Sequence, residues 1–180
     1  RTFVHQRDDM VGLDTAILMA RQVWAASGHE AGFTDPLGEG KACHHRFRAD
    51  LLEDTSSCPD CGGEFTDPRM FNLMFKTFLG PVEGDTALTY LRPETAQGIF
   101  VNFQNVASSS RKRVPFGIAQ IGKSFRNEIT PGNFIYRTRE FEQMEMEFFV
   151  HPDSADASFR EWVDFSRGFF TRLGIRNENL

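Results

Sequence analysis

The chain has 180 residues, 40% of them hydrophobic and 25% charged, with a formal net charge of -5 at pH 7. This length favours one domain, and the 19 phenylalanines predict a Phe-rich core. The negative charge excludes a protein whose whole surface follows a phosphate backbone. No apolar run of about 18 residues occurs, and Arg1 is not followed by the apolar segment of a signal peptide, so we expect a cytoplasmic protein without a membrane partner.

The N-terminal part predicts one helix followed by an irregular segment. Asp14 suits an N-cap and Gly28 suits a stop, and the apolar residues between them predict a helix over 14–27. From 28 to 68 the composition changes to Gly, Asp, Pro, His and Cys, which indicates a segment held by turns or by a metal. The apolar segment 69–80 fits either a helix or a strand.

The three cysteines are Cys43, Cys58 and Cys61. An odd number argues against a secreted disulfide framework, and the C-x-x-C spacing of the last two fits a metal or redox site in a reducing compartment.

Further along, the sequence predicts a strand over 88–91 and a helix over 93–106 with proline at its first position. Glu94 then falls in the first turn of that helix. An amphipathic helix over 154–173 is stopped by Gly174. Its expected buried residues are Phe159, Trp162, Val163, Phe169 and Phe170.

Segments 116–128 and 137–150 flank the turn signal Thr130-Pro131-Gly132-Asn133 and predict an antiparallel hairpin. Side chains alternate between the two faces of a strand, so one face is apolar and is expected in the core. Its members are Ala119, Ile121, Phe125, Met144, Met146 and Phe148. The opposite face is mostly polar and comprises Gln120, Ser124, Arg126, Glu128, Arg137, Arg139, Phe141, Gln143, Glu145 and Glu147.

The polar face has two interpretations. It is either the solvated side of a half-covered sheet or a binding surface. Its three arginines suit a polyphosphate because guanidinium forks donate paired hydrogen bonds, and Phe141 suits stacking on a planar base. Its glutamates accept hydrogen bonds from amino groups. Together these groups favour a site for ATP and an amino acid.

The hairpin residues also resemble a known family. Phe125-Arg126-Asn127-Glu128, a loop and Arg137-Thr138-Arg139-Glu140-Phe141 resemble motif 2 of class II aminoacyl-tRNA synthetases. The stretches Arg92-Pro93-Glu94-Thr95-Ala96-Gln97-Gly98 and Phe71-Asn72-Leu73-Met74-Phe75-Lys76-Thr77, among others, are similar to glycyl-tRNA synthetases in particular. The resemblance covers nearly the whole chain.

This resemblance implies an α+β fold, in which helices flank an antiparallel sheet that carries a small Cys-containing insertion. It implies that 1–180 is a partial catalytic domain, with a zinc-ribbon-like insertion at about 38–67 and the motif 2 hairpin at about 116–150. Motif 3 and an anticodon-binding domain are expected to be absent, so the fragment alone is expected to be an incomplete enzyme.

The implied activity is ATP- and Mg²⁺-dependent activation of glycine to glycyl-adenylate, followed by transfer to the 3′ end of tRNA(Gly) in a cytoplasmic homodimer. The implied ATP site comprises Arg126, Asn127, Glu128, Tyr136, Arg137 and Phe141, with Arg126 as the catalytic residue. The implied glycine site comprises Glu94, Phe141, Gln143, Glu145 and Arg48.

Two positions depart from the family pattern. Arg21 stands where the family usually has proline, and Gly40 stands where a first zinc-binding cysteine is expected. A structural zinc ion at Cys43, Cys58 and Cys61, which the resemblance implies, would then need a fourth ligand from His44 or His45. The alternative is a degenerate knuckle that holds no metal. The main rival is a non-catalytic relative, such as the accessory subunit of the mitochondrial DNA polymerase, but the expected phosphate and ammonium ligands are present here. A zinc-ribbon nucleic-acid module would account only for 40–62.

Overall fold

The computed structural model describes residues 1–180, which divide into two compact units. The first unit comprises Arg1–Gly12, Asn102–Ala119 and Met146–Leu180, and the second comprises Leu13–Val101 and Gln120–Glu145. None of the helices combines the length and the apolar character that crossing a bilayer requires.

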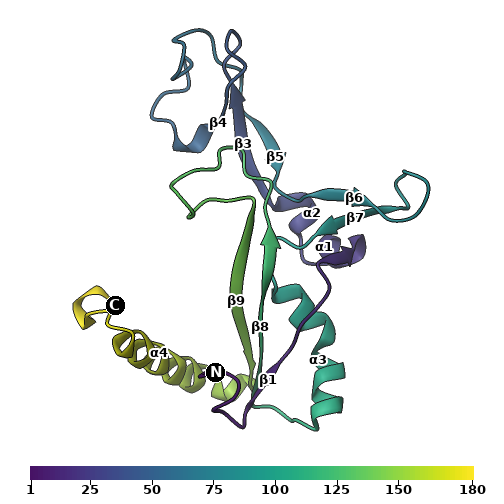
Figure 1. The fold of residues 1–180 in the computed structure, drawn as a ribbon, viewed down its shortest axis with the longest axis vertical. Coiled ribbons are helices and arrows are strands. Elements are labelled where there is room, and N and C mark those ends of the chain that lie inside the picture. The colour runs from purple at the N-terminus through teal and green to yellow at the C-terminus, as the bar shows by residue number, and fades with distance from the viewer. The chain divides into compact units, whose positions relative to one another are not determined.

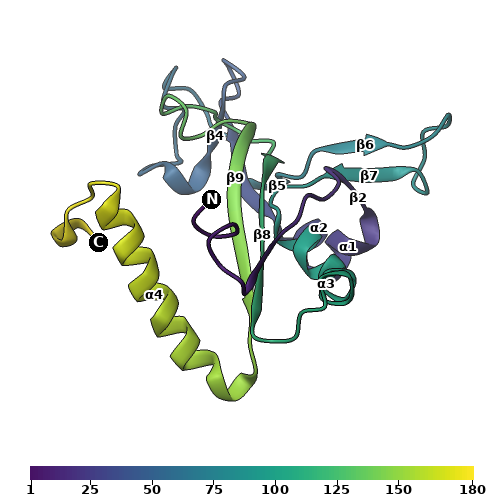
Figure 2. The ribbon, with the colours of Figure 1, turned by 60° about the horizontal axis from the view of Figure 1, so that its bottom comes forward.

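The two longest strands form the predicted hairpin. Strands β8 (Phe116–Phe125) and β9 (Glu140–Phe149) are hydrogen-bonded neighbours and run side by side in both views (Figures 1 and 2). At the loop end, the Arg126 amide donates to the Arg139 carbonyl at 2.9 Å. The third strand of this sheet, β1 (Met10–Gly12), pairs with β8 in parallel, which the sequence did not predict.

The first unit is held together by aromatic rings. The ring of Phe3 lies 5.4 Å from that of Phe165 and 5.1 Å from that of Phe169, and Trp162 lies 5.1 Å from Phe148. In a second group, Phe103 stacks on Phe116 and makes a tilted contact with Phe149. Of these rings only Phe116 is fully buried, so the predicted Phe-rich core takes the form of a half-buried aromatic cluster in this unit.

The C-terminal helix α4 (Ala155–Arg172) matches the predicted range, and Gly174 ends it in the left-handed conformation with φ +96°. The expected burial was wrong for Phe159, Val163 and Phe170, which are 70%, 49% and 41% exposed. These residues follow the same helical spacing as the packed rings. Spacing identifies an apolar stripe but does not show which side of it meets the rest of the unit.

The second unit contains two three-stranded antiparallel sheets. One has the order β2 (Leu18–Ala20), β7 (Leu88–Leu91), β6 (Lys76–Phe78), and the other the order β4 (Arg46–Arg48), β3 (Thr34–Glu39), β5 (Arg69–Asn72). Segment 69–80, which fitted a helix or a strand, therefore supplies two strands. The predicted strand over 88–91 is confirmed.

The predicted helix over 14–27 is only partly correct. Leu18–Ala20 pairs with β7, so the helix α1 is limited to Arg21–Ala26. Pairing with a distant strand overrode local helical spacing here. Arg21 is the first helical residue, a position that also accepts the proline usual in the family, and its Nε donates to Glu30 Oε1 at 2.6 Å. Gly28 ends this segment as predicted, with φ +82°, before helix α2 (His29–Gly32) begins.

Helix α3 (Ala96–Ser110) starts three residues later than predicted, so Glu94 precedes the helix instead of lying in its first turn. The short 3₁₀ helices are Ala49–Leu51, Pro152–Ser154 and Asn177–Asn179. The core of the second unit centres on Trp24, Met74 and Tyr90.

The expected burial of the hairpin faces was wrong along much of its length. On the face expected in the core, Ile121 is 69% and Met144 62% exposed. On the polar face, Gln120 is 1%, Ser124 0% and Glu128 8% exposed. Other segments cover the polar face, since Thr15 Oγ1 donates to Gln120 Oε1 at 2.9 Å and Thr95 donates to Glu145. This face is therefore not the solvated side of a half-covered sheet.

Candidate functional site

A cavity of about 360 Å³ lies at the loop end of the hairpin, within the second unit. Its lining residues are Arg126, Glu128, Ile135, Tyr136, Arg137, Thr138, Phe141 and Glu142. Five of the six residues expected to bind ATP are among them. The volume falls in the range of small-molecule sites, and the lining combines cations, carboxylates and aromatic rings.

Arg126 is held in place from three sides. Its Nε donates to the Pro93 carbonyl at 3.1 Å. Its guanidinium carbon lies 5.4 Å from the ring centre of Phe33 and 5.2 Å from that of Phe141. Cation–π attraction of this kind holds the guanidinium beside the two rings. The two terminal nitrogens have no protein partner and are available to an anion in the cavity.

Glu128 and Arg137 form an ion pair in the same lining. Arg137 Nη1 donates to Glu128 Oε2 at 3.1 Å, and the Glu128 side chain is 10% exposed against 34% for Arg137. Arg139 is not among the lining residues; its Nε donates to the Glu128 carbonyl at 3.2 Å. Arg126 and Arg137 thus both line the cavity, while Arg139 hydrogen-bonds the backbone of the lining residue Glu128.

Asn127 and Gln143 do not line the cavity. The Asn127 amide donates to the Leu73 carbonyl at 2.8 Å, which ties the loop end of β8 to the segment between β5 and β6. Gln143 Oε1 accepts a hydrogen bond from the buried Ser124 hydroxyl at 3.0 Å. Both residues support neighbouring groups instead of facing the cavity.

Glu94 and Glu145 are connected through Thr95, which follows Glu94 in the chain and donates hydrogen bonds to Glu145. Glu145 Oε2 accepts from the Thr95 amide at 3.0 Å and from the Thr95 hydroxyl at 2.5 Å. Glu94 Oε1 accepts from Gln97 Nε2 at 2.8 Å and lies 3.3 Å from His29 Nε2. Thr95, the residue after Glu94, therefore anchors Glu145, while Gln97 and His29 contact Glu94.

Arg48 is already engaged by two carboxylates. Its Nη2 lies 2.6 Å from Asp50 Oδ2, and its Nη1 lies 2.9 Å from Asp35 Oδ2. Burial raises the pKa of the Asp35 carboxyl, and the charge of Arg48 opposes that rise. The Arg48 guanidinium therefore balances acidic groups beside β3 and is absent from the cavity lining.

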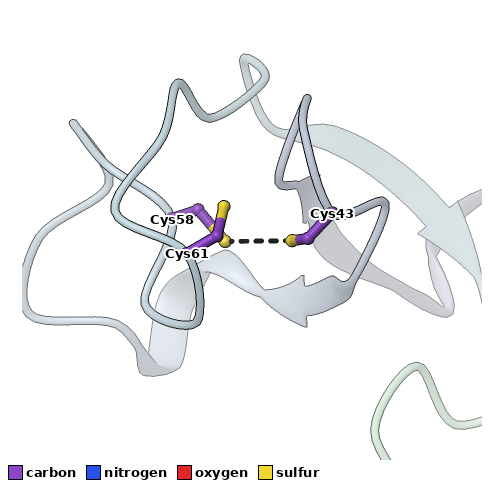
Figure 3. A group of neighbouring side chains, drawn as sticks. All are labelled: Cys43, Cys58 and Cys61. Atoms are coloured by element: carbon purple, nitrogen blue, oxygen red, sulfur yellow. Dashed lines mark hydrogen bonds between the residues drawn. The ribbon is translucent and has the colours of Figure 1, made fainter.

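The three cysteines converge although they come from two separate turns (Figure 3). Their sulfur atoms all lie within 4.8 Å of one another, and Cys43 Sγ is 3.5 Å from Cys58 Sγ. A Cβ atom at Gly40 would lie 2.5 Å from Cys58 Sγ and 2.7 Å from Cys43 Sγ. Gly40 therefore borders the thiols, as expected for the position of a missing fourth cysteine.

The neighbouring histidines do not join the thiols. His44 Nδ1 lies 3.0 Å from Glu39 Oε1, and His45 Nδ1 lies 2.5 Å from Asp60 Oδ2. The three thiolate positions suit zinc, which favours sulfur ligands, but the structure places no fourth protein ligand beside them.

Comparison with known proteins identifies the family of this chain. Residues 82–180, more than half of the chain, match the model of the tRNA synthetase class II core domain (G, H, P, S and T). The chain belongs to this family. The α+β fold predicted from the sequence is thereby confirmed.

Two curated relatives match this synthetase domain along its whole length. The "Glycine--tRNA ligase" of Cutibacterium acnes is 55% identical over 199 residues, which cover 100% of this chain and 42% of the relative. That of Thermobifida fusca is 52% identical over 197 residues, which cover 100% of this chain and 43% of the relative. The chain thus spans about two fifths of the length of the curated relatives it matches.

Among solved structures, the RNA binding domain of threonyl-tRNA synthetase from Cryptosporidium parvum Iowa II gives a TM-score of 0.59 at 19% identity. The match covers 92% of this chain and 31% of that chain. At this identity the likeness concerns the fold alone.

Sequence reasoning missed several residues around the site of the synthetase domain. Phe33 contacts Arg126 from a segment interpreted as irregular, and nothing in its local pattern indicated this role. Thr95 lies within a stretch that resembled the family, but only its acidic neighbour Glu94 was singled out, and His29 was not singled out at all. Their contacts bring together segments that are distant in the sequence, and these contacts became visible only in the structure.

Proposed function

We propose that the chain is part of a glycine–tRNA ligase, which activates glycine with ATP and transfers it to tRNA(Gly). The observation that carries this proposal is the cavity shared by Arg126, Glu128, Arg137 and Phe141. The identity of 52–55% to glycine–tRNA ligases along the whole chain supports the choice of glycine. No observation favours a non-catalytic accessory protein.

In this proposal the cavity holds the nucleotide. The terminal nitrogens of Arg126 contact the α-phosphate, and Arg137 contacts the outer phosphates. Glu128 accepts a hydrogen bond from the adenine amino group. Adenine stacks on the face of Phe141 that Arg126 leaves open, because the guanidinium already occupies the other face.

The reaction is an in-line attack of the glycine carboxylate oxygen on the α-phosphorus. The new oxygen–phosphorus bond gives glycyl-adenylate, and the bond to the leaving pyrophosphate breaks. The Arg126 guanidinium stabilises the charge that builds up on the α-phosphate oxygens, so positioning and electrostatics supply the catalysis. Mg²⁺ bound with the nucleotide neutralises phosphate charge.

Glu94 and Glu145 are proposed to hold the ammonium group of glycine. Glycine has no side chain, so side-chain contacts cannot strengthen its binding. Larger amino acids must therefore be rejected mainly by steric clash. Residues 38–67 are proposed to form an insertion within the catalytic domain, and the intact enzyme is proposed to act as a cytoplasmic homodimer.

The decisive experiment is ATP–pyrophosphate exchange by the full-length protein with glycine, alanine and serine in separate reactions. We expect exchange with glycine and at most weak exchange with the two larger amino acids. Exchange with none of them would favour the non-catalytic alternative, while preference for another amino acid would contradict glycine as the substrate.

We also propose that the three thiols bind one zinc ion per chain. Metal analysis of the purified protein should find zinc, and Cys58→Ser should remove it because only two thiols remain. His44→Ala and His45→Ala serve as matched variants: both should retain zinc, since their imidazoles contact Glu39 and Asp60. A zinc-free wild-type protein would end the proposal, and loss of zinc in one histidine variant would identify that histidine as the fourth ligand.

A further inference from the structure

The two carboxylates proposed for the glycine ammonium are each held through a single oxygen. Glu94 Oε1 faces Gln97 Nε2 and His29 Nε2, at 2.8 and 3.3 Å. Glu145 Oε2 accepts both hydrogen bonds from Thr95. The second oxygen of each carboxylate, Glu94 Oε2 and Glu145 Oε1, has no protein partner.

His29 is itself fixed in orientation. Its Nδ1 lies 2.9 Å from the Ser27 hydroxyl, and its ring lies 5.6 Å from Trp24 and 5.3 Å from Phe33. The Ser27 hydroxyl also donates to the Trp24 carbonyl at 3.4 Å. Because a carboxylate oxygen can only accept, a hydrogen bond from His29 to Glu94 requires the ring proton on Nε2.

Thr95 fixes the other carboxylate with both its backbone and its side chain. The residue is 0% exposed, and its amide and hydroxyl converge on the same oxygen of Glu145. Because Thr95 directly follows Glu94, its Cα lies only about 3.8 Å from that of Glu94. The anchor of Glu145 therefore adjoins Glu94 in the chain, whereas Glu94 itself is contacted by His29 of α2 and by Gln97 of α3.

We infer that His29 and Thr95 are positioning residues that orient Glu94 and Glu145 so that one oxygen of each remains for the substrate ammonium. This inference rests on the proposed function. An ammonium group has three N–H donors and is best bound by acceptors fixed in advance, because no binding energy is then spent on ordering them. Loss of either positioning residue should therefore weaken glycine binding and leave ATP binding unchanged.

The Thr95 test uses full-length enzyme and ATP–pyrophosphate exchange. Thr95→Val keeps the shape but loses the hydroxyl, and it should raise the KM for glycine about 10-fold or more, as expected for a lost hydrogen bond to a charged group. Thr95→Ser retains the hydroxyl and should restore most of the affinity. Thr89→Val is the matched control, because Thr89 is 3% exposed and donates only to the Met19 carbonyl at 2.8 Å.

The His29 test follows the same design. His29→Leu removes the donor beside Glu94 and should raise the KM for glycine, whereas His29→Gln supplies an amide donor at the position of Nε2 and should recover part of the affinity. Equal effects on the KM for ATP, or the same rise in Thr89→Val, would overturn the inference. Wild-type enzyme without glycine-dependent exchange would instead refute the proposed function. If Thr95→Val unfolds at a lower temperature than the wild-type enzyme, the inference is tested on the two His29 variants instead.

Discussion

Replacing Arg126 with alanine is expected to slow glycyl-adenylate formation by about 100- to 1,000-fold in the full-length enzyme. The guanidinium is fixed before substrate arrives, by the Pro93 carbonyl at 3.1 Å and by the rings of Phe33 and Phe141. A preorganised charge of this kind stabilises the transition state without reorganising during the reaction. Single-turnover measurement of adenylate formation gives the rate directly.

Two further variants sharpen this prediction. Arg126→Lys should recover only a small part of the rate, because an ammonium group neither forks onto a phosphate nor stacks as a plane between two rings. Arg69→Ala removes an exposed arginine on β5 and should leave the rate unchanged. A wild-type rate in Arg126→Ala would show that the cavity does not bind the α-phosphate.

The cavity lining was largely predictable from the sequence because its members lie close together along the chain. Arg126, Glu128, Arg137 and Phe141 stand near the ends of two strands joined by one loop, so forming the hairpin suffices to bring them together. Local spacing and a turn signal carry that information. The predicted hairpin strands consequently agree with the structure to within a few residues.

Burial and long-range contacts were not predictable in the same way. The alternating pattern correctly placed Ile121 and Gln120 on opposite faces of the hairpin. It did not show which face is buried, because that depends on other segments, such as the one in which Thr15 bonds Gln120. Likewise, Leu18–Ala20 has helical spacing but pairs with β7. In both cases the deciding partner is distant in sequence. Arg48, expected at the substrate, contacts Asp35 and Asp50, and its role there stays a prediction.

Replacing Trp24 with alanine is expected to lower the free energy of unfolding by about 3–5 kcal/mol, the usual cost of deleting a large buried ring. Trp24 is 0% exposed and packs with Met74 and Tyr90, and Phe33 is among the partly buried residues around it. The cavity left by alanine adjoins the segment that carries His29 and Phe33, so collapse there would also disturb the site. Urea unfolding monitored by circular dichroism measures the change in stability.

Trp24→Phe separates lost packing from lost hydrogen bonding. The indole Nε1 is buried without a hydrogen-bond partner, so phenylalanine forfeits volume but no hydrogen bond and should cost less than half as much as alanine. Phe134→Ala is the exposed control: this ring is 87% exposed, and its removal should change stability by no more than about 0.5 kcal/mol. If Trp24→Phe proved as costly as Trp24→Ala, the indole N–H would have to be bonded in solution, contrary to the packing described for this core.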